Sequence, residues 1–258
     1  MLSLDSKVKS VFITGGTSGI GLSLAQKYIE MGYFVGVCGR DLDKISDFNH
    51  DHLKKYKVDI INAHELDQSV DDFYKAHGLD IMIASAGIGY ANKSQLPDFD
   101  RSKLIFKTNV EGVLNAFESA MKYMVENKSG QLVAIASVAG FNGLPGVSAY
   151  SASKAAVIKI CETFTIDLLK FGINVTCINP GFIDTPLTRK NKHPMPFLMD
   201  SDIAANLIIK AILKRKVTYS FPFLFAYFVK FLGMIPRSLY VKIMRKDGMN
   251  YSVKTTKD

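Results

Sequence analysis

The chain has 258 residues, of which 48% are hydrophobic and 22% charged, and this composition suits one α/β domain with a sizeable core. Its first residues, MLSLDSK, lead directly into an apolar run without the pattern of a secretory signal, so we expect a cytoplasmic protein. The three scattered cysteines predict buried, reduced thiols. The five histidines form no metal-ligand pattern with them, so we assign no metal.

Apolar runs alternate with helix-like stretches along the chain. Strands are predicted over 8–14, 33–38, 55–59, 79–84, 131–136 and 173–178. Helices are predicted over 19–31, 42–53, 63–76, 100–127, 149–171 and 201–214. The strand runs are mostly apolar rather than alternating, which is typical of strands buried on both faces. The alternation therefore predicts a Rossmann-like, doubly wound parallel sheet in three α/β/α layers.

The first predicted strand runs into the glycine-rich sequence TGGTSGIG. Gly15 allows a sharp turn, and Gly19 and Gly21 lack the Cβ atoms that would keep a pyrophosphate away from the backbone. The helix that follows offers free N–H groups and a partial positive charge to an anion. Thr17 and Ser18 add hydroxyl donors. The turn is therefore a candidate dinucleotide-binding site.

Three further side chains, spaced as S-x12-Y-x3-K, carry the candidate chemistry. Tyr150 and Lys154 lie four residues apart among good helix formers and so share one helix face. Ser137 follows an apolar strand at its carboxyl end, where ligands bind in such sheets. We expect the Lys154 ammonium to lower the pKa of the Tyr150 phenol and make it a general acid and base. Ser137 would hydrogen-bond the substrate oxygen.

Together these motifs resemble the short-chain dehydrogenase/reductase family, in register to about residue 215. The resemblance implies that Asn109, in FKTNVEG, completes the catalytic set through a water-linked proton path. It also implies that Lys154 binds the nicotinamide ribose and that Ile183 and Thr185 hold the carboxamide. The implied cofactor contacts are Gly15, Thr17, Ser18, Gly19, Ile20, Gly21, Arg40, Asp59, Ile60, Ala86, Gly87, Tyr150, Lys154, Pro180, Gly181, Ile183 and Thr185.

Two departures from the family pattern concern the cofactor. Gly39 stands where an NAD-selecting acid would sit, and the guanidinium of Arg40 can fork onto a 2′-phosphate, which favours NADP(H) over NAD(H). Asp41 argues the other way, although we interpret it as the N-cap of the helix predicted to follow. The family's NNAG segment is ASAG here, so Ser85 is expected to replace a stabilising asparagine.

The stretch after Thr185 matches the family's substrate loop. Its apolar residues can cover an apolar substrate or pack into the core, and both interpretations remain open; they are Leu187, Met195, Phe197, Leu198 and Met199.

The C-terminal part departs most from the soluble tetrameric members of the family. Residues 206–258 hold eleven Lys and Arg but two Asp and Glu, a segment charge of +9 within a total of +8. Residues 221–235 are almost wholly apolar, too short to span a bilayer securely, and are followed by the apolar and basic PRSLYVKIMRK. We therefore expect a catalytic domain over 1–218 with a helical extension over 219–258.

Two interpretations of that extension remain open. Residues 221–246 can lie in the headgroup region of a membrane, or they can pack on a partner subunit or over the active site. A nucleic-acid groove is not indicated.

The resulting hypothesis is an NADP(H)-dependent oxidoreductase that interconverts a lipophilic ketone or aldehyde and its alcohol. The alternatives are a soluble 3-oxoacyl reductase, or a cofactor-binding sensor or scaffold without relevant turnover. The resemblance also implies a homodimer through the long helices predicted over 100–127 and 149–171.

Overall fold

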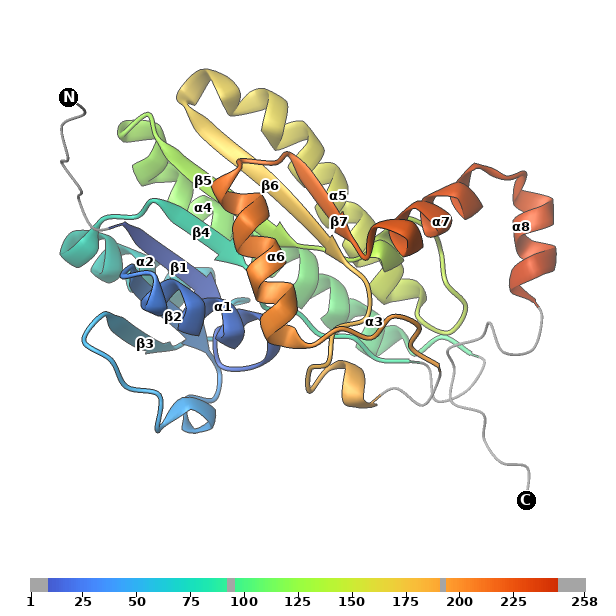
Figure 1. Cartoon of the computed structure of the whole chain (residues 1–258), viewed down its shortest axis with the longest axis horizontal. Helices are drawn as coiled ribbons and strands as arrows, with labels where there is room; N and C mark the ends of the chain where they lie inside the picture. Colours follow the sequence, from blue (N-terminus) through green and yellow to red (C-terminus); the bar gives the residue numbers. More distant parts are fainter. Residues whose placement is uncertain (1–8, 92–95, 191–193, 246–258) are drawn as a thin grey trace.

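Seven parallel strands form one sheet through the centre of the molecule (Figure 1). The structure, a computed structural model, describes residues 9–91, 96–190 and 194–245. The strands are β1 Ser10–Thr14, β2 Phe34–Gly39, β3 Leu53–Lys57, β4 Ile81–Ala84, β5 Gly130–Ile135, β6 Ile173–Pro180 and β7 Thr218–Phe221. Their order in the sheet is β3-β2-β1-β4-β5-β6-β7, so the winding reverses between β1 and β4. This reversal opens a crevice at the carboxyl ends of the strands.

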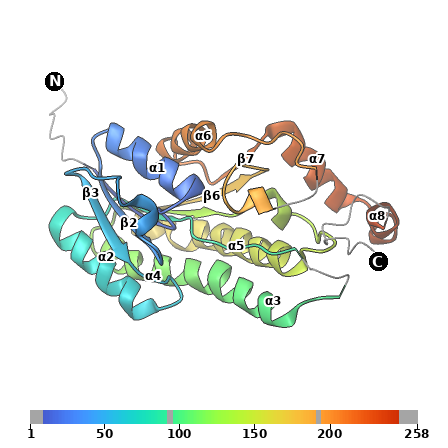
Figure 2. The same cartoon turned by 90° about the horizontal axis from the view of Figure 1, so that it is seen from below.

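Helices cover both faces of the sheet, as Figure 2 shows, with α1 and α6 on one side and α2, α4 and α5 on the other. Their bounds are α1 Gly19–Glu30, α2 Ala63–His77, α3 Phe99–Phe106, α4 Gly112–Glu126, α5 Ser148–Asp167, α6 Ser201–Leu213, α7 Phe223–Met234 and α8 Arg237–Met244. The predicted Rossmann-like, three-layer α/β/α fold is thereby confirmed.

Two hydrophobic cores, one on each face, explain the continuous apolar strand runs. Phe12 of β1 packs with Phe73 and Phe117 on the side of α2 and α4. Its neighbour Ile13 packs with Leu24 and other residues on the side of α1 and α6. Because successive strand side chains point to opposite faces, both must be apolar in a sheet that is covered twice.

The helix predicted over 42–53 is wrong. The chain forms only the short 3₁₀ turn η1 (Asp43–Ile45) there and then irregular backbone up to β3. Polar side chains in this stretch satisfy the backbone locally: the Asn49 amide donates to the Ser46 carbonyl, and the His50 ring accepts the His52 N–H. Such local hydrogen bonds compete with a helix.

The long helix predicted over 100–127 is interrupted rather than continuous. A π-helical turn, η2 (Lys107–Glu111), separates α3 from α4 and contains Asn109. Such turns are frequent at functional sites.

The C-terminal segment continues the sheet before it leaves it. β7 pairs in parallel with β6, so the expected boundary between 218 and 219 falls inside a strand. α7 and α8 then project from one end of the molecule (Figures 1 and 2). Within the described part of the chain, no helix combines the length and apolar character needed to cross a membrane. The three cysteines are buried and free, as expected.

Candidate active site

A cleft of about 350 Å³ lies at the carboxyl ends of the strands, where the winding of the sheet reverses. Its volume falls in the range of about 300–1,000 Å³ that is usual for small-molecule sites. The cleft is lined by Ser137 and by every residue that the family resemblance implied as a cofactor contact. Residues more than 160 positions apart in the sequence, such as Gly15 and Thr185, therefore meet at one place.

In the glycine-rich turn the backbone packs closely against neighbouring backbone. Gly15 adopts φ +68°, and a Cβ on it would lie 2.7 Å from the Ala86 Cα. A Cβ on Gly21 would lie 2.3 Å from the Gly15 carbonyl oxygen, so both positions require glycine. Ser18, the N-cap of α1, makes no capping hydrogen bond with its side chain. The first-turn N–H groups of α1 are thus open to an anion, as a dinucleotide phosphate would require.

The end of β2 forms the second wall of the cleft. A Cβ on buried Gly39 would lie 2.6 Å from the Cγ2 of Thr17, so the threonine fills the space that an acidic side chain would need. Arg40 is exposed and lines the cleft. The Asp41 carboxylate accepts the Asp43 N–H at 3.2 Å, and it pairs with Lys44 at 3.2 Å. The predicted N-cap role of Asp41 is therefore wrong, because no α-helix follows and the N-cap of η1 is Leu42.

Ser137, Tyr150 and Lys154 come together on the cleft from β5 and α5. The Ser137 hydroxyl accepts the Ala139 N–H at 3.1 Å and so caps the short turn η3 (Val138–Gly140). The Lys154 ammonium donates to the Ile135 carbonyl at 2.8 Å and lies 5.8 Å from the centre of the Tyr150 ring. Lys154 is buried and Tyr150 half-buried, so both groups work in a poorly solvated niche.

The expected lowering of the Tyr150 pKa by Lys154 is wrong for the protein alone. Burial raises the pKa of Tyr150 above its ordinary value of 10.0, opposed by a hydrogen bond with Ser137. Burial also lowers the pKa of Lys154 from 10.5 to about 8. Loss of hydration sets the direction of the shift for both groups, and the Lys154 ammonium donates to the Ile135 carbonyl.

Asn109 lies behind the cleft rather than on its wall. Its side-chain oxygen accepts the Ile88 N–H at 2.8 Å, and its amide donates to the Ile88 carbonyl at 2.9 Å and to Ser153 at 3.0 Å. The residue is fully buried. In this structure Asn109 holds the segment after β4 against α5, and its polar atoms already have protein partners.

The turn after β4 differs from expectation in how it is held. The Thr14 hydroxyl accepts the backbone N–H groups of Ser85 and Ala86, both at 3.2 Å. The hydroxyl of β1, rather than the side chain of Ser85, therefore provides the stabilising bonds. The sequence signal for this role is only a threonine at the end of β1, next to the glycines.

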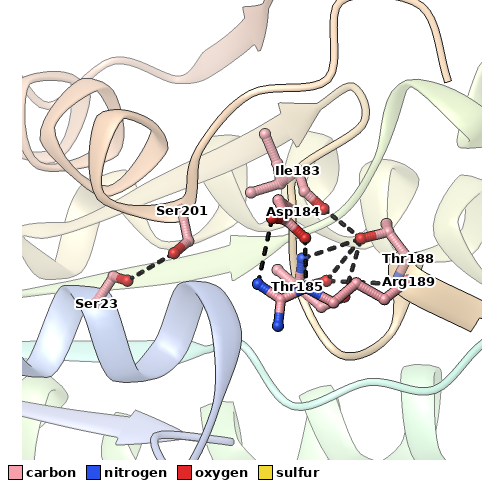
Figure 3. Close-up of polar contacts among 7 residues, drawn as sticks. All are labelled: Ser23, Ile183, Asp184, Thr185, Thr188, Arg189 and Ser201. Atoms are coloured by element: carbon pink, nitrogen blue, oxygen red, sulfur yellow. Dashed lines mark hydrogen bonds and ion pairs between the residues drawn. The ribbon is translucent and has the colours of Figure 1, made fainter.

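The loop after β6 closes the far end of the cleft, and Figure 3 shows its polar contacts. The Thr188 hydroxyl accepts the Thr185 N–H at 3.0 Å and donates to the Ile183 carbonyl. Arg189 forms a two-pronged ion pair with Asp184 at 2.7 and 3.2 Å. The methyl group of Thr185 lies 3.0 Å from where a Cβ on Gly19 would be, so the loop meets the glycine turn directly.

The expected substrate loop is divided between two environments. Leu187 lines the cleft, and Met199 packs against the core on the side of α1 and α6. Phe197 and Leu198 are exposed. Residues 191–193 of this loop lie outside the described residues.

Sequence reasoning missed several cleft residues. Lys44 falls inside the stretch predicted as a helix, the role of Thr188 depends on the fold of its loop, and Thr108 and Ile88 carry no local signal. Among the described residues, no group of three or more His, Cys, Asp or Glu side chains is arranged to hold a metal ion.

The fold and this cleft together define a nucleotide-binding α/β protein with a serine, a tyrosine and a lysine at its site. The model of the short chain dehydrogenase family matches residues 9–196. An uncharacterized oxidoreductase of Myxococcus xanthus is 33% identical over 251 residues, which cover 94% of this chain and 98% of that protein. The chain therefore belongs to the short-chain dehydrogenase family, a family of oxidoreductases.

Other relatives agree with this assignment. An uncharacterized oxidoreductase of Staphylococcus aureus strain MW2 is 34% identical over 185 residues, covering 70% of this chain and 80% of that one. A short-chain dehydrogenase from Burkholderia cenocepacia, solved in complex with NADP, has the same fold with a TM-score of 0.81 at 20% identity, covering 93% of this chain and 99% of that chain. One from Streptomyces avermitilis has a TM-score of 0.79 at 22% identity, covering 93% and 96%.

Proposed function

We propose that this protein is an NADP(H)-dependent oxidoreductase that interconverts a lipophilic ketone or aldehyde and its alcohol. The observation that carries the proposal is the convergence of Ser137, Tyr150 and Lys154 on the cleft that also receives the glycine turn. When bound there, a nicotinamide dinucleotide would supply or accept the hydride. The chain's own residues would transfer the proton and hold the substrate oxygen in position.

Tyr150 is the proposed general acid and base. Its raised pKa keeps the phenol protonated at neutral pH, ready to donate from its hydroxyl to an oxygen that gains negative charge. Ser137, which lines the cleft beside Tyr150, would hold the same substrate oxygen. Lys154, with its pKa near 8, is mostly protonated at neutral pH and would stabilise the phenolate left after the transfer.

The preference for NADP(H) rests on charge at the end of β2. Arg40 is an exposed cation on the cleft wall, and Lys44 lies close by. The Asp41 carboxylate, which would repel a 2′-phosphate, already pairs with Lys44 and accepts the Asp43 N–H. The NADP complex of the Burkholderia cenocepacia relative is consistent with this choice.

A lipophilic substrate is supported by the aromatic side chains beside the cleft. Phe225 of α7 lies 6.1 Å from Phe182 and 6.0 Å from Phe197, between ring centres, where the loop after β6 meets α7. Gly181 lines the cleft, and a Cβ on it would lie 3.4 Å from the Phe225 ring. An apolar substrate at this edge would bury these rings.

The experiment is NADPH oxidation by the purified full chain with ketones and aldehydes of graded chain length. Turnover that improves with chain length, and that is faster with NADPH than with NADH, is expected. Tight NADPH binding without turnover on any carbonyl of the panel would overturn the enzymatic proposal in favour of a sensor or scaffold. Turnover confined to short polar carbonyls would overturn the lipophilic substrate.

We further propose a homodimer through the surface of α3, α4 and α5. Large apolar side chains are exposed there, including Leu104, Leu114 and Ile166. Sedimentation equilibrium should give about twice the mass of 28.6 kDa expected for one chain. A monomer at micromolar concentration would contradict the dimer.

A further inference from the structure

α7 presents an apolar face to solvent that is unusual for a surface helix. Six large apolar side chains on it are more than half exposed, from 57% for Tyr227 to 81% for Met234. They are Phe223, Leu224, Tyr227, Phe228, Phe231 and Met234. At 100° per residue these positions fall within one side of the helix, so they form a single patch, hereafter the α7 face. A patch of this kind marks an interaction site.

The opposite side of α7 is anchored to the protein. Ala226 is fully buried, and the Asn142 amide donates to the Val229 carbonyl at 2.5 Å. Phe225 packs with Phe182 and Phe197 as described above. The α7 face is therefore exposed because the helix is held in this orientation, with its other side already occupied.

The segment of chain that forms and flanks the α7 face carries only basic charges. The sequence contains no Asp or Glu between Asp202 and Asp247. Exposed cations of α7 and α8 and their ends are Lys230, Arg237, Lys242 and Arg245. None of them forms an ion pair within the described part of the chain. Two copies of such a surface would repel each other, whereas an anionic partner would be attracted.

We propose that the α7 face docks on the surface of an anionic lipid bilayer. The apolar and aromatic side chains would enter the headgroup and acyl boundary, and the cations would face the lipid phosphates and carboxylates. The 12 residues of α7 extend over about 18 Å, against a hydrocarbon core of about 30 Å, so the helix lies in the plane of the interface.

Docking in this way places the cleft at the lipid surface. The chain enters α7 through Pro222, and a Cβ on the cleft residue Gly181 would lie 3.1 Å from the Pro222 ring. Phe225, in the first turn of α7, packs on the loop after β6. A lipophilic substrate dissolved in the bilayer would therefore reach the site along the rings of α7; this delivery step rests on the proposed function, whereas the docking does not.

The test is co-sedimentation of the full chain with vesicles, without substrate or cofactor, so that its result is independent of catalysis. One set of vesicles is pure phosphatidylcholine and the other contains about one-third phosphatidylserine. We expect binding to the anionic vesicles that weakens with salt, and binding at least tenfold weaker to the neutral ones. Absence of binding to anionic vesicles, or equal binding to both, would overturn the proposal.

Variants locate the contact. Phe228→Ser combined with Phe231→Ser should weaken vesicle binding at least tenfold. The matched control is Ile203→Ser with Leu213→Ser, which alters two apolar side chains of α6 that are 56% and 50% exposed, and should leave vesicle binding unchanged. Lys242→Gln should cost about fivefold on anionic vesicles alone.

Folding and self-association are controlled in the same samples. NADPH binding and thermal unfolding of each variant show whether the protein remains folded. An equal loss of vesicle binding in the α6 control would contradict docking through the α7 face. A fall in oligomeric state in the α7 variant, with wild type failing to bind vesicles, would show that the face contacts a second copy instead.

Discussion

Replacement of Arg40 by alanine tests the proposed cofactor preference most sharply. Arg40 is an exposed side chain on the cleft wall at the end of β2. In water, two unit charges about 4 Å apart interact by about 1 kcal/mol, and a 2′-phosphate carries up to about two charges. The loss of about 1.5–2 kcal/mol corresponds to about 10–30-fold weaker NADPH binding. NADH, which lacks that phosphate, should bind almost unchanged.

The assay is titration of the purified protein with NADPH and with NADH, reported as the ratio of the two dissociation constants. Arg101→Ala is the matched control, because Arg101 is also a partly exposed arginine, paired with Asp98 outside the cleft. Asp41→Asn should shift the ratio further toward NADPH, because it removes a negative charge and releases Lys44. A ratio that does not change in Arg40→Ala, or that falls equally in Arg101→Ala, would refute the reasoning.

Three further predictions concern the glycine turn, the buried lysine and the buried asparagine. Gly21→Ala should weaken NADPH binding more than tenfold, because its Cβ would lie 2.3 Å from the Gly15 carbonyl oxygen; Gly143→Ala, with nothing within 4 Å, should bind normally in the same titration. Burial lowers the pKa of Lys154 from 10.5 to about 8, so between these values the unfolded chain binds more protons than the folded protein, and stability rises with pH. Urea unfolding should therefore show the wild type gaining about 2 kcal/mol relative to Lys154→Met from about pH 7.5 to about pH 9.5; a constant difference would contradict the burial. Asn109→Ala should lower the free energy of unfolding by about 1–3 kcal/mol, since it leaves the Ile88 N–H and carbonyl without their partner; an unchanged urea midpoint would show that these bonds are dispensable.

The fold was predictable because apolar strand runs alternate with helix-like stretches along most of the chain. The central strands are apolar at successive positions, as Phe12 and Ile13 of β1 illustrate by packing into different cores. The glycine turn was predictable for a steric reason: Gly15 and Gly21 occupy positions where a Cβ would collide with backbone. Tyr150 and Lys154 were predictable as neighbours from helix geometry alone.

Features that depend on tertiary packing were not predictable. Residues 42–53 have the composition of a short helix, but local hydrogen bonds of Asn49 and His50 favour a loop. The pKa of Tyr150 depends on how far burial removes water, which spacing does not reveal. The stabilising role of Thr14 requires β1 and β4 to be adjacent, a contact between residues about 70 positions apart.

The C-terminal helices were predictable from the sequence only in part. The sequence indicates an apolar, basic extension, but it leaves open which side chains are covered. In the structure Ala226 is buried, whereas Phe228 and Met234 are exposed, and this identifies the side chains that form the α7 face. The occupant of that face is the subject of the vesicle experiment.

The central claim is that Tyr150 transfers the proton in a hydride-transfer reaction. Its most direct test is Tyr150→Phe, measured for turnover on the best carbonyl substrate and for NADPH affinity in parallel. The account predicts that turnover falls at least a hundredfold, because the acid is removed, while NADPH binds within about threefold of wild type. Turnover at the wild-type rate in this variant would contradict the account.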